Sequence, residues 1–177
     1  MLFPAVSAAH NLRFAVMRYW LYKSEPDVYG IDHLQRDGTT IWDGVRSYQA
    51  RNNLAAAALG DRVFIYHSSA DPPGIAGLAE VVETNVVDPL QFDPISKYYD
   101  ATSKPVEPRW ITVRIRFLEK FFNFLPLELL RRSFSIEELV TLRKGNRLSV
   151  TPVAEAAADR LLAMGRGGQE PRRSARS

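Results

Sequence analysis

A segment in which apolar and polar residues alternate strictly constrains the fold more than any other feature of the chain. Within residues 109–117 the apolar series is Ile111, Val113, Ile115 and Phe117, and the intervening series is Trp110, Thr112, Arg114 and Arg116. A period of two places successive side chains on opposite faces of a β-sheet. The segment therefore predicts a strand with one face in the core and one polar face.

Several other segments have the composition of strands, and short helical segments separate them. The predicted strands cover residues 19–22, 39–42, 62–68, 74–87 and 148–150, with 121–125 as a continuation of the sheet. The predicted helices cover residues 31–36, 47–60 and 126–132, a segment that follows the capping box at Ser135, and a last one that begins at Thr151 and Pro152. Without regular βαβ alternation, this order predicts an α+β domain with a curved, mainly antiparallel sheet or open β-barrel and short flanking helices.

The composition excludes several kinds of site. A chain of 177 residues fits one domain, and it contains no cysteine, so disulfides, cysteine-based zinc sites and a thiol nucleophile are excluded. The three histidines have no spacing typical of metal ligands. We therefore expect no metal and no cofactor.

The charge is concentrated at one end of the chain. Four arginines and one glutamate between Gly165 and Ser177 account for the whole net charge of +3. We expect residues 165–177 to be a disordered basic tail, residues 17–164 to be the folded domain, and residues 1–16 to be an extension outside the fold. No apolar run approaches the roughly 20 residues of a membrane span, and we expect a monomer with no membrane contact.

Residues 41–52 combine an aromatic side chain, a turn and two arginines. Asp43-Gly44 turns the backbone after Trp42, and Ser47 can cap the helix that follows. Arg46 and Arg51 flank this helix start, so the segment can hold a flat, polar ligand that carries phosphate. The alternative is that Trp42 packs in the core, as most tryptophans do.

Polar residues also end two predicted strands, at Lys23-Ser24 and at His67-Ser68. Residues 88–108 have no regular period but carry several aromatic residues, and a loop of this length in a compact domain is usually functional. We expect these segments to contribute to a binding site.

A set of motifs, in chain order, resembles the EVE domain family. They are Tyr19-Trp20-Leu21-Tyr22-Lys23-Ser24-Glu25-Pro26, Trp42-Asp43-Gly44-Val45-Arg46, Ala50-Arg51-Asn52, Tyr66-His67-Ser68, Pro72-Pro73-Gly74-Ile75, Phe92-Asp93-Pro94, Lys97-Tyr98-Tyr99-Asp100, Pro108-Arg109-Trp110 and Gly145-Asn146-Arg147-Leu148-Ser149-Val150. The resemblance implies a PUA-like fold and a non-catalytic module that reads a modified base, chiefly modified cytosine in DNA. It implies nucleic acid as the partner, with modified DNA preferred and RNA as an alternative.

A flipped base needs flat walls and hydrogen-bonding groups along its polar edge. For the walls we expect Trp42 to stack on the base, with Tyr66, Tyr98, Tyr99 and Trp110 beside it. The groups expected to read the edge are Lys23, Ser24, His67, Ser68 and the backbone of Gly44 and Val45. The residues expected to hold phosphates are Arg46, Arg51 and Arg147.

Two other classes of function stay open on the sequence. A hydrolase would use Glu25, His67 and Ser68, although neighbouring strand residues point to opposite faces and His67 would not easily activate Ser68. A small-molecule-binding module would reuse the same pocket. In a bacterium we expect the protein in the cytoplasm, and in a eukaryote in the nucleus.

Overall fold

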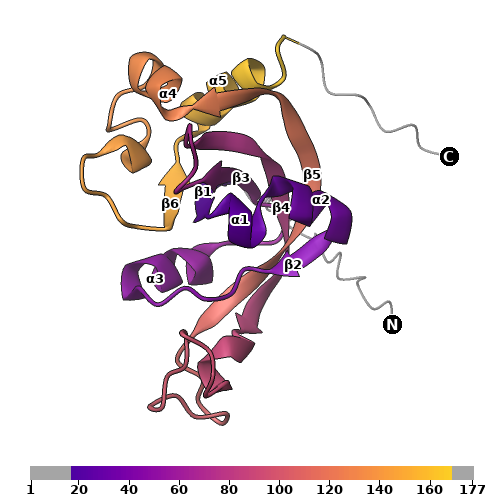
Figure 1. The fold of residues 1–177 in the computed structure, drawn as a ribbon, viewed down its shortest axis with the longest axis vertical. Helices are drawn as coiled ribbons and strands as arrows, with labels where there is room; N and C mark the ends of the chain where they lie inside the picture. The colour runs from indigo at the N-terminus through magenta and orange to yellow at the C-terminus, as the bar shows by residue number, and fades with distance from the viewer. Residues whose placement is uncertain (1–16, 169–177) are drawn as a thin grey trace, which may run out of the picture.

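One mixed sheet of six strands organises the computed structural model, which describes residues 17–168 (Figure 1). The strands are β1 (Tyr19–Ser24), β2 (Thr39–Ile41), β3 (Arg62–His67), β4 (Gly74–Val87), β5 (Ile111–Pro126) and β6 (Val150–Val153). Their order is β2-β5-β4-β3-β1-β6, and only the pair of β1 and β3 is parallel. The two end strands do not pair, so the sheet is open, and the predicted α+β class is confirmed.

Short helices lie between the strands and at the end of the described chain. They are α1 (Pro26–Tyr29), α2 (Ile31–Asp37), α3 (Tyr48–Ala56), α4 (Leu127–Ser133) and α5 (Glu155–Gly165), with 3₁₀ turns η1 (Pro89–Phe92) and η2 (Val140–Leu142). The helix predicted after Asp43-Gly44 is α3, and the Ser47 hydroxyl accepts a hydrogen bond from the Ala50 N–H, as a cap does.

The central strands are buried on both faces. Along β1, Tyr19 and Leu21 pack with α4 and α5, whereas Trp20 and Tyr22 pack in a second cluster with α2 and α3. This alternation follows from the two-residue period of a strand. Trp20 is therefore a core residue.

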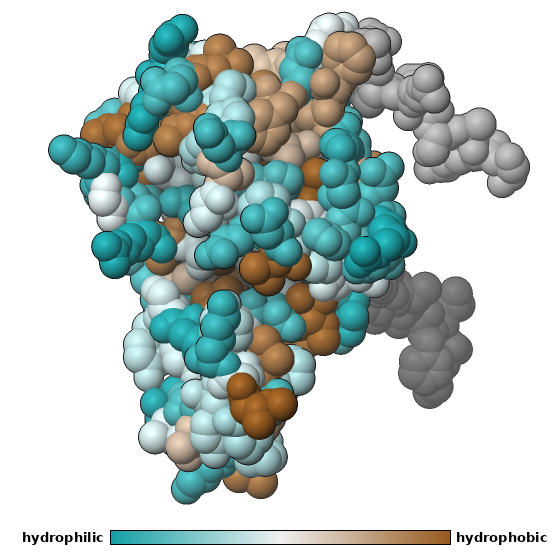
Figure 2. Space-filling view, viewed as in Figure 1, coloured by the Kyte–Doolittle hydropathy of each residue, from teal (hydrophilic) through white to brown (hydrophobic). Residues whose placement is uncertain are grey.

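The strand β5 is longer than its alternating part. It continues through Phe121 and Leu125, both buried, while Phe122 is 76% exposed. The register between β4 and β5 shifts at several points, which bends the pair, and apolar side chains cover the surface around α4 and the end of β5 (Figure 2).

Two predicted helix starts are wrong. Thr151 and Pro152 belong to β6, where they pair with Leu21 and Trp20, and the helix begins only at Glu155. A proline is tolerated there because β6 is an edge strand.

The capping box at Ser135 also starts no helix. The Ser135 N–H donates to Glu138 and the Glu138 N–H donates to the Ser135 hydroxyl, so the expected bonds are present. A single turn follows, and then η2, because Leu139 and Leu142 turn into the core beside α5.

The folded part of the chain extends beyond the predicted start of the basic tail at residue 165. Gly165 is the last residue of α5, and the Nε atom of Arg166 donates to the Glu119 carboxylate at 3.0 Å. The predicted extension 1–16 and residues 169–177 lie outside the described residues. Across residues 17–168 no helix combines the length and the apolar character needed to cross a membrane.

Candidate nucleic-acid interface

The ends of β1 and β3 bring four of the predicted ligand residues together. In the parallel register Lys23 lies opposite Tyr66 and Ser24 lies opposite His67. The Lys23 ammonium lies 5.9 Å from the centre of the Tyr66 ring and donates to the Asn146 carbonyl at 3.2 Å. Lys23 is half-buried at the end of β1, and this burial lowers the pKa of its ammonium.

Ser24 and Ser68 are joined through the backbone. The Ser68 N–H donates to the Ser24 carbonyl at 2.8 Å, and the Ser24 hydroxyl donates to the carbonyl of Tyr29. These two serines therefore fix the chain where β1 and β3 end.

His67 is held by the start of a helix. Its Nε2 accepts a hydrogen bond from the Ile31 N–H at 3.0 Å, and Gly30 leaves room for the ring. Burial lowers the pKa of the imidazole, which suits a neutral ring that accepts this bond. Among the described residues no hydrogen bond joins His67 to the Ser68 hydroxyl, so the geometry gives the predicted hydrolase alternative no nucleophile–base pair here.

The Trp42 ring lies mainly in the core. It is 8% exposed, and its centre lies 5.3 Å from the centre of the Tyr22 ring, next to Lys23 in the sequence. Its backbone N–H donates to the Val113 carbonyl at 2.9 Å, and its carbonyl accepts from the Thr112 hydroxyl. Trp42 thus belongs to the core cluster that contains Tyr22.

Gly44 follows with a left-handed backbone, φ +75°, in close contact with Tyr98. A Cβ at this position would lie 2.8 Å from the Tyr98 ring, so only glycine fits. The Gly44 N–H, predicted to read a base edge, donates instead to Asp88 at 2.9 Å. Val45 is half-buried and packs against the cluster that contains Trp42.

Arg46 is enclosed by a carboxylate and two aromatic rings. Its Nη1 lies 2.6 Å from Asp88, whose side chain is 2% exposed, and its Nε donates to the Tyr98 carbonyl at 2.7 Å. The guanidinium lies 5.6 Å from the Tyr98 ring centre and 5.2 Å from that of Trp110. Sequence reasoning missed Asp88, which ties the turn after Trp42 to the segment 88–110.

Arg51 lies on a more open aromatic surface. Its guanidinium lies 4.9 Å from the ring centre of Tyr48 and 5.9 Å from that of Trp110, and those rings stack at 5.2 Å. No carboxylate among the described residues pairs with Arg51. Tyr48 is exposed and was not predicted as a site residue, although its place in the first turn of α3 is the signal that identifies it.

The segment 88–110 is built around buried polar groups. The Gln91 amide donates to the carbonyls of Asp88 and Trp110 at 2.8 and 2.9 Å, and the Trp110 indole N–H donates to Asp100 at 2.8 Å. Hydrogen bonds, chiefly from Thr102 and Trp110, lower the pKa of Asp100 to about 2. Tyr99, predicted as a wall, is 45% exposed on this segment.

The predicted residues thus form two groups, near opposite ends of β4 and β5. Lys23, Ser24 and Tyr66 lie at the strand ends, whereas Gly44, Arg46, Tyr98 and Trp110 lie between the turn after β2 and the segment 88–110. Trp42 connects them, because it contacts Tyr22 and immediately precedes the turn. Arg147 is exposed on the segment that leads into β6.

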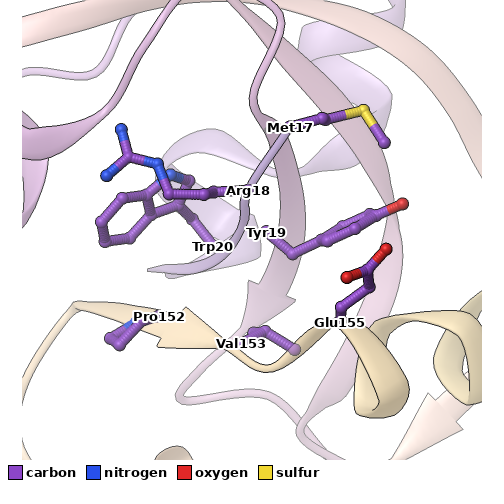
Figure 3. Close-up of a pocket in the computed structure, with 7 residues that line it drawn as sticks. All are labelled: Met17, Arg18, Tyr19, Trp20, Pro152, Val153 and Glu155. Atoms are coloured by element: carbon purple, nitrogen blue, oxygen red, sulfur yellow. The ribbon is translucent and has the colours of Figure 1, made fainter. Parts of the chain in front are cut away.

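A separate hollow of about 290 Å³ opens at the other end of β1 (Figure 3). Arg18 covers Trp20 on one side of it, and Tyr19 and Glu155 lie on the other. It contains none of the predicted ligand residues. Within the same described range, 17–168, no group of three or more histidine, aspartate or glutamate side chains is placed to hold a metal ion.

A family model and several known proteins match nearly the whole described chain. A family model described as the EVE domain matches residues 18–164. Thymocyte nuclear protein 1 of Mus musculus is 37% identical over 164 residues, which cover 82% of this chain and 73% of that protein. A crystal structure of a Pseudomonas syringae protein shares 46% identity with a TM-score of 0.78, covering 82% of this chain and 98% of that one. A crystal structure of human THYN1 protein in complex with DNA containing 5-methylcytosine shares 34% identity with a TM-score of 0.76, covering 87% and 99%.

Proposed function

The chain belongs to the EVE domain family, and from this premise we propose that it is a non-catalytic module that binds DNA and reads a modified cytosine. The observation that carries the proposal is the human relative in complex with DNA containing 5-methylcytosine, which shares the fold over almost its whole length. RNA is the alternative ligand, and the experiment below separates the two.

We assign the base-reading role to the group at the strand ends. The Lys23 ammonium lies beside the Tyr66 ring, which is 6% exposed, and Ser24 follows on the opposite face of β1. Trp42 packs in the second core cluster, on the Tyr22 face of β1, with the apolar side chain of Val45 against the same cluster. A flipped base requires an aromatic ring to stack on and hydrogen-bonding groups along its edge, and the strand ends hold both kinds of group.

The second group has a different part in this proposal. Arg46 is neutralised by Asp88, so we assign it to positioning the turn after Trp42 instead of binding phosphate. Arg51 and Arg147 have no carboxylate partner among residues 17–168 and keep their phosphate-binding assignment. The exposed Tyr48 ring stacks on the buried Trp110 ring and lies beside Arg51.

The test is a binding titration against matched oligonucleotides. The purified chain is titrated with DNA carrying one 5-methylcytosine, the same DNA with plain cytosine, and RNA of the same sequence. We expect the methylated DNA to bind at least tenfold more tightly than the plain DNA. Equal affinities for the methylated and plain DNA would contradict the proposal, and preference for the RNA would favour the alternative.

A pair of lysine variants locates the reading group. Lys23→Met keeps an apolar side chain at the end of β1 but removes the ammonium, so we expect at least a tenfold loss of affinity for methylated DNA. Lys120→Met is the matched control, because Lys120 pairs with Asp32 at 2.6 Å on β5 and α2. A loss of the same size in both variants would argue against the assignment of Lys23.

A further inference from the structure

The segment between η2 and β6 carries basic side chains without acidic neighbours. Arg143, Lys144 and Arg147 are all exposed, and no aspartate or glutamate occurs between Glu138 and Glu155. None of the three forms a salt bridge with any residue of 17–168. We call residues 143–147 the basic turn. Hydrophilic side chains project along the edge of the molecule where it lies (Figure 2).

The basic turn has a fixed backbone. The Asn146 amide donates to the Val140 carbonyl at 2.8 Å and accepts from the Leu148 N–H at 2.9 Å, and the Asn146 N–H donates to the Arg143 carbonyl at 3.0 Å. Gly145 supplies the left-handed conformation that the turn needs, with φ +76°. Three cationic side chains are therefore presented from a defined loop.

Its position is beside the strand ends. The Lys23 N–H donates to the Ser149 carbonyl at 2.8 Å, and the Lys23 ammonium donates to the Asn146 carbonyl. From the other side, the Asn53 amide of α3 donates to the Val150 carbonyl at 2.8 Å. The basic turn therefore adjoins Lys23, and the strand that follows it adjoins α3, as Figure 1 shows for the start of β6.

Many other exposed cations are neutralised. On β5, Arg114 pairs with Glu83 at 2.8 Å and Arg116 pairs with Glu80 at 2.6 Å. In the sequence outside the predicted tail, basic and acidic residues balance. Against that neutral background, a run of unpaired cations beside the candidate site is a local positive field that attracts an anionic chain.

We propose that the basic turn binds the backbone phosphates of the nucleic-acid strand whose base enters the site. The inference rests on the proposed function, and it adds Arg143 and Lys144 to the phosphate-binding residues. A phosphate contact carries no sequence information, so it strengthens the binding of methylated and plain DNA alike. Each phosphate neutralised adds about 0.9 to the slope of log affinity against log salt on duplex DNA.

Two triple variants of equal charge change test the basic turn. The first is Arg143→Gln, Lys144→Gln and Arg147→Gln. The second is Arg36→Gln, Arg114→Gln and Arg131→Gln, whose arginines pair with Asp37, Glu83 and Glu128. Both are titrated with methylated and plain DNA over a series of salt concentrations. We expect the first to lower the salt slope by about 2–3, at about 0.9 for each phosphate that is no longer neutralised, and the second to leave it near the wild-type value.

The outcomes for the two proposals are distinguishable. A salt slope that stays at the wild-type value in the first triple variant, or that falls equally in both, overturns the role of the basic turn. A slope that falls in the first variant without any preference of the wild type for methylated DNA overturns base reading and supports the turn. A third variant, Arg143→Lys with Arg147→Lys, keeps the charge and should keep the slope. If its slope also fell, disturbed folding and not charge would be the cause.

Discussion

At the scale of single residues, burial and pairing decide what each predicted ligand residue can do. Trp42 and Arg46 both carry the side-chain chemistry that the sequence predicts for a base-binding site. Trp42 is largely buried, however, and Arg46 meets a carboxylate 42 positions further along the chain. A sequence pattern reports residue types and spacing, so it cannot show which long-range partner a side chain takes. The positions of Lys23 and Tyr66 near the ends of strands could be predicted from the local pattern, and their roles in binding stay predictions.

Trp42 offers a direct test of burial against ligand stacking. We expect Trp42→Ala to lower the free energy of unfolding by about 3–5 kcal/mol, as truncation of a buried aromatic side chain does. Trp42→Phe keeps an apolar ring against Tyr22 and should stay folded, so methylated-DNA binding is measured on that variant. Tyr99→Ala, at an exposed ring, is the control and should change stability by no more than about 0.5 kcal/mol. A small stability change for Trp42→Ala would contradict the buried placement.

His67 makes the stability of the fold depend on pH, and the sign of this dependence follows from the burial of the ring. Burial lowers its pKa below the ordinary value of 6.5, so the unfolded chain takes up a proton before the folded chain does. The stability that this histidine contributes is complete above pH 6.5 and is lost as the pH falls through the lower pKa of the folded state. Chemical denaturation between pH 8 and about pH 5 should show this loss. His67→Gln should flatten the profile while keeping an acceptor for the Ile31 N–H, and an unchanged profile would count against the mechanism.

At the scale of the elements, local patterns predicted strands better than helix starts. The alternation in residues 109–117 marks β5, and the small and apolar residues of 74–87 mark β4. Thr151-Pro152 has the local signature of a helix start, yet it pairs with β1, which is about 130 positions earlier. Pairing with a distant strand overrides such a local signature when it completes a sheet.

Asp88 is the residue on which two elements of the site depend. Its carboxylate accepts from Gly44, Arg46 and Leu90, and so joins the turn after β2 to the segment 88–110. We expect Asp88→Asn to cost about 3–5 kcal/mol, because it leaves the largely buried Arg46 without its counter-charge.

A double-mutant cycle separates this pairing from other effects of the substitution. Combining Asp88→Asn with Arg46→Met removes the unpaired charge. The double variant should therefore lose less free energy of unfolding than the two single variants lose in total. Urea denaturation of all four proteins measures it. Strictly additive losses would show that the pair is not coupled.

At the scale of the whole molecule, the fold brings segments from distant parts of the chain to β1, where Trp42 packs against Tyr22 and Lys23 donates to the Asn146 carbonyl. Lys23 comes from the first strand, the turn after Trp42 follows the second, and the basic turn precedes the last. Their order along the chain could be recognised from motifs, but their adjacency depends on the strand order β3-β1-β6, which no local pattern specifies.

The position of β1 between β3 and β6 affects how the chain folds during its synthesis on the ribosome. The first strand finds its last partner in Val150–Val153, so this pairing must wait until β6 has been synthesised. Domains built on such distant contacts fold more slowly than those built on neighbouring segments. A nascent chain that has released only β1 to β5 leaves one edge of β1 unpaired and lacks the turn that covers Lys23. The candidate nucleic-acid interface is therefore complete only after β6 leaves the exit tunnel.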